Sequence, residues 1–389
     1  MQHLSPDQEL CLRHILEWYK KDKLAMQYVT LGGYAGTGKT TLIAFLRKEL
    51  NRIDKKLKVG FASYTGKAAR VLQSKLKEEK AVLKHDTVGT IHSLIYTPIV
   101  NAREEIVGWK QKEKIECDLI IIDEASMVDS IIWEHLLSYL KPIVVVGDHG
   151  QLPPVKGNFN LMEKPDVTLV EIHRQAKHNP IIEVSIQARV AGEIRVGRYS
   201  DTVIKFDRNE SETGERMTEL LNSYTSDTLI LCGYNTTRKR LNAYIRSSLG
   251  FESPTPVSGD RVICLRNNHK AKIYNGMLGT ILRIERKNDQ WYTADIAMDG
   301  SELNYSGQIS VAQFNADTAL NFTENRRLIM GGDLFDFGYA LTVHKAQGSQ
   351  AKRVVLFEER FKKMDDDQWR RWLYTAVTRA EEELYIFPS

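Results

Sequence analysis

Short, nearly continuous apolar runs alternate with longer helical stretches along the first half of the chain. The runs are rich in β-branched residues and occupy residues 28–31, 59–63, 119–122, 143–146 and 168–170. Runs of this length, separated by helical segments, are typical of strands that are buried on both faces of a parallel sheet. The pattern therefore predicts an α/β domain over residues 1–172.

The second half of the chain repeats this pattern and interrupts it once. Strand-like runs accompany helical patterns and predict a second α/β domain over residues 173–389; the runs are 228–232, 354–357 and 384–387. Between about residues 259 and 328 the strand-like segments are punctuated by Gly, Asn and Asp, which favours a small antiparallel β-barrel inserted into this domain. A shorter insertion at about residues 95–116 interrupts the first domain.

The composition is that of a globular protein, because 42% of the 389 residues are hydrophobic, 27% are charged and only 10 are proline. The net charge of +4 is compatible with a polyanionic partner and equally with many other enzymes. The four cysteines lie far apart without a C-x-x-C pair, which argues against a zinc site and favours a reduced, intracellular protein. We find no signal peptide and no apolar stretch of membrane-spanning length, so we expect a cytoplasmic protein without membrane contact.

A glycine-rich segment between a predicted strand and a predicted helix carries the first chemistry. Its sequence, GYAGTGKT at residues 33–40, fits the phosphate-binding pattern G-x-x-x-x-G-K-[ST]. The loop amides would surround the phosphates of ATP, Lys39 would supply a positive charge to the β- and γ-oxygens, and the Thr40 hydroxyl would ligate Mg²⁺. The residues expected to bind the nucleotide here are Gly33, Gly36, Thr37, Gly38, Lys39, Thr40 and Thr41. A chance glycine-rich turn is the alternative.

Polar residues at the ends of two further strands complete the pattern of a P-loop nucleoside triphosphatase. Asp123 and Glu124 end the third strand, where they would provide an Mg²⁺-binding carboxylate and a base for the attacking water. Gln151 follows the next strand and would sense the γ-phosphate and orient that water. A surface turn residue before two prolines is the alternative for Gln151.

The remaining sequence blocks, taken in order, resemble the motifs of superfamily 1 helicases. The blocks are TGKAA (65–69), TIHS (90–93), DEAS (123–126), GDHGQLPP (147–154), HRQ (173–175), LTVHKAQGS (341–349) and YTAVTRA (374–380). The last two blocks resemble the 5′→3′ subgroup, the RecD and Dda-like helicases. The resemblance runs from about residue 4 to residue 381 and implies two RecA-like domains, a duplex-splitting hairpin in the first and an SH3-like barrel in the second.

This resemblance assigns further nucleotide contacts. Gln8 matches a glutamine that recognises adenine, with an exposed polar residue before the first helix as the alternative. Arg174 and Arg379 match arginines that reach the γ-phosphate from the second motor domain, with an ordinary salt bridge as the alternative for each. Gln347 and Gly348 match a motif that lines the nucleotide cleft and connects it to DNA.

The resemblance also assigns contacts with DNA. Thr65, His92, Thr342 and His344 match positions that contact the strand in relatives, and for each of them a purely structural role is the alternative. In the insertion at residues 95–116, segments around Pro98 and Trp109 would form the arms of the duplex-splitting hairpin. The Trp109 ring would stack on a base, or alternatively it would pack the hairpin onto the motor domain.

These expectations converge on an ATP-dependent, Mg²⁺-requiring 5′→3′ DNA helicase that acts on single-stranded and forked DNA as a monomer. A translocase that strips proteins but unwinds poorly is one alternative. An inactive helicase-like scaffold is another, although a scaffold would have no need for the complete set of catalytic residues.

Overall fold

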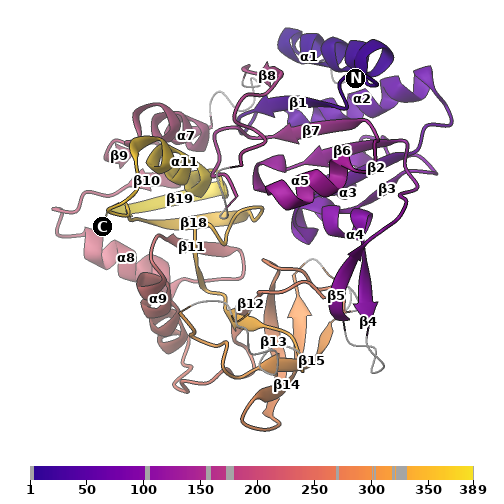
Figure 1. Cartoon of the computed structure of the whole chain (residues 1–389). Helices are drawn as coiled ribbons and strands as arrows, with labels where there is room; N and C mark the ends of the chain where they lie inside the picture. Colours follow the sequence, from indigo (N-terminus) through magenta and orange to yellow (C-terminus); the bar gives the residue numbers. More distant parts are fainter. Residues whose placement is uncertain are drawn as a thin grey trace. The chain divides into compact units, whose positions relative to one another are not determined.

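Figure 1 shows the computed structural model of the chain, which describes residues 4–100, 106–154, 159–171, 179–268, 271–299, 301, 304–317, 320 and 331–388. The chain divides into two compact units, Met1–Glu183 (unit 1) and Val184–Ser389 (unit 2). The expected domain boundary between residues 172 and 173 lies outside the described residues.

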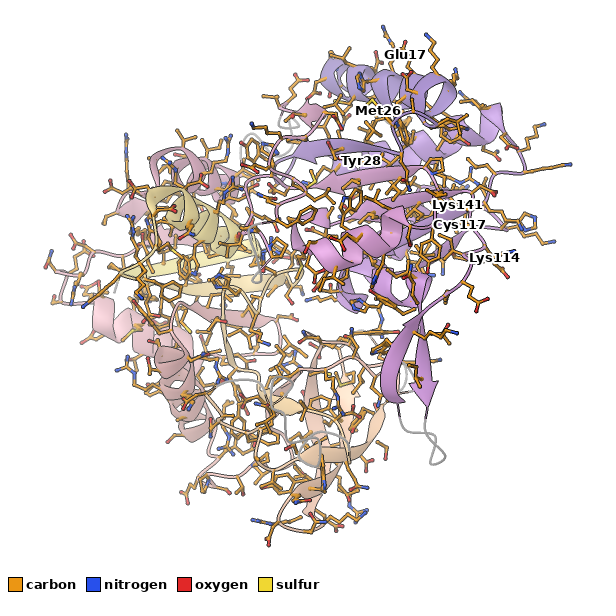
Figure 2. All side chains as sticks on the ribbon, in the orientation of Figure 1. Glu17, Met26, Tyr28, Lys114, Cys117 and Lys141 are labelled. Carbon is orange, nitrogen blue, oxygen red and sulfur yellow. The ribbon has the colours of Figure 1, made fainter. Side chains whose placement is uncertain are left out.

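Unit 1 is built on a six-stranded parallel sheet with the strand order β3-β2-β6-β7-β1-β8. Its strands are β1 (Tyr28–Gly33), β2 (Val59–Ser63), β3 (Thr87–Thr90), β6 (Leu119–Asp123), β7 (Ile143–Gly147) and β8 (Val167–Leu169). The strands β2, β6 and β7 are buried at every position, as their apolar sequences require. Figure 2 shows Tyr28, Cys117 and Lys141 at the end of the sheet where β1, β6 and β7 begin, so the carboxyl ends of these strands meet at the opposite edge.

Helices cover both faces of this sheet. The helices α1 (Pro6–Glu17), α2 (Lys39–Ile53) and α3 (Gly66–Glu78) contribute to one hydrophobic cluster, whereas α4 (Ile91–Ile95) and α5 (Ser130–Leu137) contribute to another. Along β6, Leu119 and Ile121 belong to the first cluster and Ile120 and Ile122 to the second, as the alternation of a strand dictates. A π-helix (Trp18–Asp22) follows α1, and a 3₁₀ turn (Ala125–Met127) follows β6.

The expected hairpin is present in unit 1. It consists of β4 (Tyr96–Val100) and β5 (Ile106–Gln111), which pair antiparallel with Pro98 opposite Trp109. The hairpin follows α4 directly and extends away from the sheet of its own unit (Figure 1). Lys114 and Cys117, both labelled in Figure 2, lie on the segment that returns from the hairpin to β6.

Unit 2 contains a second α/β sheet with the order β17-β11-β18-β19-β10-β9, parallel except for the β9–β10 pair. Its strands are β9 (Gly197–Arg198), β10 (Val203–Lys205), β11 (Thr228–Cys232), β17 (Ala340–Thr342), β18 (Ala351–Glu358) and β19 (Ala380–Pro388). Its described helices of eight residues or more are α7 (Pro180–Ala191), α8 (Thr213–Asn222), α9 (Asn235–Ser248) and α11 (Asp366–Val377). The second α/β domain expected from the sequence is therefore present.

Between β11 and β17 lies an antiparallel five-stranded sheet with the order β15-β14-β13-β12-β16. Its strands are β12 (Arg261–Cys264), β13 (Leu278–Arg286), β14 (Trp291–Met298), β15 (Tyr305–Ser310) and β16 (Phe335–Phe337), so the sheet continues beyond residue 328. Asp333 N donates to Gln308 O over 2.7 Å, and Ser310 N donates to Asp333 O over 3.0 Å. These two bonds connect β15 to the residues that enter β16 and so link the two ends of the strand order.

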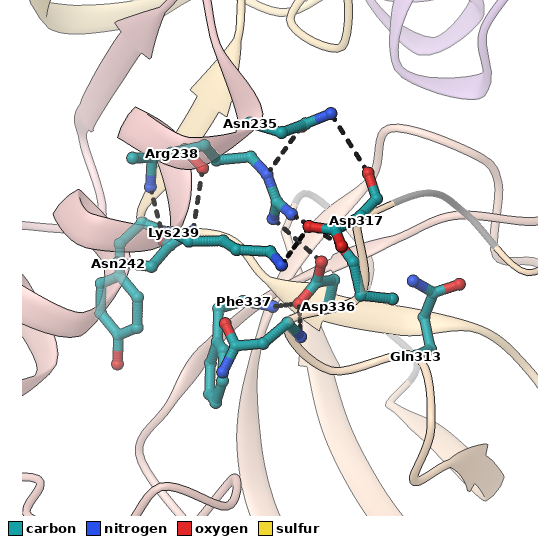
Figure 3. Close-up of polar contacts among 12 residues, drawn as sticks. Asn235, Arg238, Lys239, Asn242, Gln313, Asp317, Asp336 and Phe337 are labelled. Carbon is teal, nitrogen blue, oxygen red and sulfur yellow. Dashed lines mark hydrogen bonds and ion pairs between the residues drawn. The ribbon is translucent and has the colours of Figure 1, made fainter.

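A polar cluster fastens this antiparallel sheet to α9 (Figure 3). The Arg238 Nη1 atom lies 2.9 Å from Asp336 Oδ2, and both side chains are buried. Lys239 pairs with Asp317, and the Asn235 side-chain amide donates to the Asp317 carbonyl over 3.2 Å. The amino-terminal turn of α9 therefore carries three contacts with the inserted sheet.

All four cysteines of the chain are free and buried. Burial raises the pKa of the Cys11 thiol to about 11 and the pKa of each of the Cys232 and Cys264 thiols to about 12. The pKa of Cys117 is also raised by burial. Within the ranges that the structure describes, no helix is both long and apolar enough to cross a lipid bilayer.

Candidate functional site

The glycine-rich loop forms the expected turn between β1 and α2. Gly36 and Gly38 have φ angles of 79° and 76°, in the left-handed region that glycine adopts without a steric penalty. The ammonium of Lys39 donates to the carbonyls of Gly33 and Tyr34 over 2.7 and 3.0 Å. Thr40 and Thr41 directly follow Lys39 in the sequence and lie in the first turn of α2.

Gln8 links the first helix to this loop. Its Nε2 atom donates to Thr37 O over 3.1 Å, and its Oε1 atom accepts a bond from Ser5 N over 3.0 Å. The side chain is only 1% exposed, so the alternative of an exposed polar residue is wrong. Gln8 therefore holds α1 against the phosphate-binding loop.

The acidic pair Asp123–Glu124 at the end of β6 has an energetically unfavourable backbone conformation and an unfavourable electrostatic environment. Glu124 has φ 56° and ψ 41°, a left-handed conformation that strains a residue with a side chain. Burial and then the charge of Glu124 raise the pKa of Asp123 to about 6, against 3.8 for an ordinary aspartate. The nearby Lys39 ammonium opposes this shift. A bound cation would offset the cost of placing these two carboxylates together.

The side chains around Asp123 fit a magnesium–nucleotide complex. Three buried oxygens lack a hydrogen-bond partner among the described residues: Glu124 Oε2, Ser63 Oγ and Ser126 Oγ. Ser63 is the β2 residue that pairs with Asp123 in the sheet register. No group of three or more acidic, histidine or cysteine residues within the described ranges could hold a metal by itself. Thr40 and Asp123 would supply two oxygen ligands, and Mg²⁺ ordinarily completes its shell with phosphates and water.

The segment after β7 adds Gln151 to the same edge of the sheet. Gln151 is 5% exposed, and its Nε2 atom lies 3.5 Å from Asp148 Oδ2. The neighbouring His149 ring packs on Tyr34 of the glycine-rich loop with the ring centroids 4.2 Å apart. Because Gln151 is buried, the alternative of a surface turn residue is wrong.

The sheet thus brings together candidate nucleotide-binding residues that are far apart in the sequence. The strand β7 lies between β6 and β1, with Ile122 opposite Val145 and Gly32 opposite Gly147. The carboxyl ends of these three strands carry the acidic pair, Gln151 and the glycine-rich loop. Open α/β sheets bind ligands at this edge.

Two residues expected to bind DNA follow neighbouring strands of the same sheet. Thr65 caps α3, where its hydroxyl oxygen accepts a bond from Ala68 N over 3.2 Å. His92 lies in α4, with its ring centroid 6.4 Å from that of Tyr64 and 5.4 Å from that of Tyr96. Thr65 therefore has a structural role, and its hydroxyl proton is still available to donate to a ligand.

In the hairpin, Pro98 and Trp109 form a cross-strand pair. The Trp109 side chain is half-buried.

In unit 2, the candidate residues follow β17. Thr342 ends this strand and is 9% exposed. The His344 ring stacks on Phe361, with the centroids 6.5 Å apart, and burial lowers the pKa of His344, so its neutral form is favoured. Gln347 is buried, and Gly348 has a φ of 73°, which requires glycine.

Arg379 follows α11 and is 3% exposed. Its guanidinium donates to Thr375 O over 2.9 Å, to Ser349 O over 3.2 Å and to the Thr378 hydroxyl over 3.2 Å. None of the ion pairs that the described residues form includes Arg379, so the salt-bridge alternative is not supported. Arg174 lies outside the described residues.

Sequence patterns missed residues that act at a distance. The Glu359 carboxylate accepts bonds from Gly233 N and Tyr234 N over 2.8 and 3.0 Å and from the Thr237 hydroxyl over 2.6 Å, which fixes the loop that leads into α9. The Tyr96 hydroxyl and His135 Nδ1 lie 2.6 Å apart. Glu359 and Gly233 are 126 residues apart in the sequence, and Tyr96 and His135 are 39 residues apart. No local sequence pattern could therefore have revealed these contacts.

Two family models match the chain. The model for the AAA domain matches residues 3–211, and the model for the UvrD-like helicase C-terminal domain matches residues 337–387. The first match covers unit 1 with its glycine-rich loop, and the second covers the segment that includes Gln347 and Arg379.

Several helicases are similar in sequence. The ATP-dependent RecD2 DNA helicase of Deinococcus radiodurans is 28% identical over 395 residues, which cover 94% of this chain and 47% of that protein. The chain thus spans about half the length of this relative. The ATP-dependent DNA helicase Dda of Enterobacteria phage T4 is 24% identical, with 94% of this chain and 95% of that protein covered.

The fold is similar to solved helicase structures. A Bacteroides Pif1 helicase in complex with ADP-AlF3 and single-stranded DNA matches with a TM-score of 0.57 at 17% identity, covering 99% of this chain and 92% of that one. A second Pif1 structure, described as unwinding forked double-stranded DNA, matches with a TM-score of 0.55 at 18% identity. At these identities the match establishes the fold, with its two RecA-like domains.

Proposed function

We propose that this chain, which belongs to the AAA domain family, is a superfamily 1B helicase of the RecD and Pif1 group that couples ATP hydrolysis to 5′→3′ movement along single-stranded DNA and to duplex unwinding. The observation that carries this proposal is the arrangement at the carboxyl edge of the unit 1 sheet. There the Lys39 loop, the strained Asp123–Glu124 pair and buried Gln151 follow neighbouring strands.

In the proposed reaction the amides of the 33–40 loop and Lys39 hold the ATP phosphates. Thr40 and Asp123 would hold Mg²⁺, and the bound ion would supply positive charge beside the phosphoryl group that is transferred. The buried Glu124 Oε2 atom accepts the proton of the attacking water, and Gln151 orients that water. Arg174 and Arg379 stabilise the transition state, and Gln8 recognises adenine beside the loop to which it is bonded.

The DNA track involves both sheets. Thr65 and His92 contact the strand from unit 1, and Thr342 and His344 contact it from unit 2. Pro98 and Trp109 of the hairpin meet the strand at the fork. The five-stranded antiparallel sheet forms an SH3-like barrel in this scheme; the bonds of Gln308 and Ser310 with Asp333, which lies two residues before β16, support this closure. One chain contains every residue of this scheme, so the monomer is the active form.

Single-turnover unwinding of short duplexes with either a 5′ or a 3′ single-stranded tail tests this proposal. We expect ATP- and Mg²⁺-dependent unwinding of the 5′-tailed substrate alone, together with single-stranded-DNA-stimulated ATP hydrolysis. Lys39→Ala should abolish both activities and leave nucleotide-free DNA binding near the wild-type level, because this ammonium acts on phosphate oxygens of ATP.

Preferential unwinding of the 3′-tailed substrate would contradict the proposed polarity. The chain would be a translocase if single-stranded DNA stimulates its ATP hydrolysis and it displaces proteins from DNA, but it does not separate the strands of a duplex. Wild-type hydrolysis by the Lys39→Ala variant would remove the nucleotide assignment.

A further inference from the structure

The base of the β4–β5 hairpin is closed by one tyrosine. Lys112 N donates to Ile95 O over 2.8 Å where the two strands leave the motor domain. The Tyr139 hydroxyl lies 2.9 Å from Ile95 O and 2.8 Å from Lys112 O, so it contacts a backbone carbonyl on each side of the hairpin. This single side chain therefore joins the incoming and outgoing strands at their root.

Further contacts hold both strands to the carboxyl end of α5 and the residue that follows it. On the β4 side, the Tyr96 hydroxyl lies 2.6 Å from His135 Nδ1. On the β5 side, Gln111 Nε2 donates to the Ser138 hydroxyl over 2.7 Å and also lies 3.4 Å from the His135 carbonyl. The three residues His135, Ser138 and Tyr139 occupy the carboxyl end of α5 and the turn that follows it. We refer to these three residues as the hairpin clamp.

The helix that bears the hairpin clamp is itself anchored firmly in unit 1. Trp133 and Leu136 are buried, and the Trp133 ring packs edge-on against Tyr28 of β1 with the centroids 5.0 Å apart. Gln27 Nε2 donates to Leu137 O over 2.9 Å and to Lys141 O over 3.2 Å. The clamp end of α5 is thus bonded both to the hairpin and to the amino edge of the central sheet.

The other end of α5 follows directly from the acidic loop of the nucleotide site. Only the 3₁₀ turn Ala125–Met127 and two further residues separate Glu124 from the first residue of α5. Asp129 caps the helix, since its carboxylate accepts a bond from Ile132 N over 2.9 Å. An eight-residue helix is about 12 Å long, so α5 connects the two sites as one short, rigid element.

An isolated two-stranded hairpin is marginally stable in water, so its direction depends on how its base is held. The residues that hold this base are polar, and they belong to the element that begins at the nucleotide loop. We propose that the hairpin clamp makes α5 a lever, so that a change of conformation at Glu124 on nucleotide binding is transmitted to the hairpin.

On this inference His135, Ser138 and Tyr139, with Tyr96 and Gln111, are positioning residues for unwinding. Their role in unwinding rests on the proposed function, whereas the transmission from nucleotide to hairpin does not. The two parts are therefore tested by separate measurements.

The first measurement compares Tyr96→Phe, Tyr139→Phe and the double variant with wild type. Phenylalanine keeps the ring and removes only the hydroxyl. We expect DNA-stimulated ATP hydrolysis within about twofold of wild type, and unwinding per ATP reduced about fivefold in each single variant and about twentyfold in the double variant, as the loss of one and two net hydrogen bonds implies.

Tyr199→Phe is the matched control. Tyr199 lies in unit 2, and its hydroxyl bonds to Gln187 Oε1 and to Arg195 O over 2.9 and 2.8 Å. It therefore loses a similar pair of contacts away from the hairpin, and we expect its unwinding per ATP to equal that of wild type. If Tyr139→Phe is unfolded at the assay temperature, Tyr96→Phe carries the test.

The second measurement is hydrogen exchange of the β4 and β5 amides with and without Mg²⁺ and a non-hydrolysable ATP analogue. We expect the nucleotide to change exchange at the hairpin base in the wild type and the control, and not in the double variant. A wild-type hairpin that does not respond to the nucleotide, or a double variant that responds fully, would overturn the lever whatever the unwinding result. Absence of unwinding by the wild type, with the exchange response intact, would count against the proposed function alone.

Discussion

At the scale of single residues, the carboxyl edge of the unit 1 sheet keeps two acidic residues in conformational and electrostatic states that are unfavourable in the absence of a ligand. Asp123 is buried next to a second carboxylate, and Glu124 has a left-handed backbone. Strain of this kind persists only where the surrounding structure enforces it, and it concentrates at functional sites. We therefore expect the folded protein to become more stable when a bound cation, or a neutral side chain in place of Asp123, removes the repulsion between the two carboxylates.

The Asp123→Asn variant tests this cost through pH. In the folded protein the pKa of Asp123 is raised from 3.8 to about 6, so its contribution to stability is greatest when it is protonated and is lost as pH rises from about 4 to 6. Asparagine carries no charge at any pH. Without Mg²⁺, we expect the variant to exceed wild type in free energy of unfolding by about 2–3 kcal/mol at pH 8.

The measurement is urea unfolding of both proteins at pH 4.5 and pH 8 in a chelating buffer. The difference between the proteins should fall to roughly 1 kcal/mol at pH 4.5, and the variant should have no Mg²⁺-dependent ATP hydrolysis. An equal difference at both pH values would show that the Asp123 charge is not the cause.

Arg379 gives a second prediction at this scale. Loss of an arginine that contacts the γ-phosphate costs P-loop enzymes roughly 10³- to 10⁵-fold in rate, so Arg379→Ala should lose turnover in this range while ATP affinity changes only a few-fold. Arg379→Lys should fail to rescue it, because an ammonium cannot reproduce the planar donor fork that bonds Thr375, Ser349 and Thr378.

Arg371→Ala is the control on α11, where Arg371 forms an ordinary ion pair with Asp367. Steady-state hydrolysis and equilibrium nucleotide binding separate the two effects. Equal loss of turnover and affinity in the Arg379 variants, with a lowered melting temperature, would indicate a structural arginine.

At the scale of elements, two roles remain for Trp109 in the hairpin: stacking on a DNA base, or packing the hairpin onto the rest of unit 1. Trp109 is half-buried and pairs across the strands with Pro98. If its ring stacks on a base at the fork, a contact worth roughly 1–3 kcal/mol is lost in Trp109→Ala. We expect a folded protein with substantial DNA-stimulated hydrolysis and about tenfold less unwinding per ATP.

The alternative for Trp109 is that the ring packs the hairpin onto the motor domain. In that case the Trp109→Ala melting temperature and its ATP hydrolysis should fall together. Unwinding per ATP equal to that of wild type would rule out the stacking role.

Local sequence patterns predicted the elements whose burial is continuous and missed those defined by long-range pairing. The runs at 59–63, 119–122 and 143–146 are strands with every residue buried, and their short, continuous apolar sequences identify them. The strand Thr87–Thr90 has a single large apolar residue, so its pairing with β2 could be learned only from the fold. The strand Phe335–Phe337 pairs with β12 across the whole inserted sheet, which explains why the insertion was expected to end too early.

The same distinction holds for the candidate site. Residues within the glycine-rich loop and the DEAS block act over a few positions, so their spacing reveals them. Contacts such as Tyr96–His135 and Glu359–Gly233 depend on which elements pack together, and they carry no local signature.

At the scale of the whole molecule, each unit has its own parallel sheet and its own inserted β element. In unit 2 the insertion is bonded to α9 through Arg238, Lys239 and Asn235, so it should move with its sheet as one body. In unit 1 the hairpin is bonded to α5 in the same manner. If binding of ATP changes the separation of the two units, as the proposed function requires, the insertion in unit 2 should follow its own sheet, whereas the hairpin in unit 1 should respond through α5.

The buried thiols make such motion accessible to fluorescence. Since Cys11, Cys117, Cys232 and Cys264 are all buried and their pKa values are raised, maleimide dyes should react with the native chain far more slowly than with an exposed cysteine. Lys55→Cys and Glu210→Cys each place one thiol at an exposed position, one in each unit. We expect this double variant to take up two dyes, the parent chain to take up almost none, and energy transfer between the dyes to change on binding of an ATP analogue. Rapid labelling of the parent chain would show that one of the four thiols becomes exposed during thermal opening.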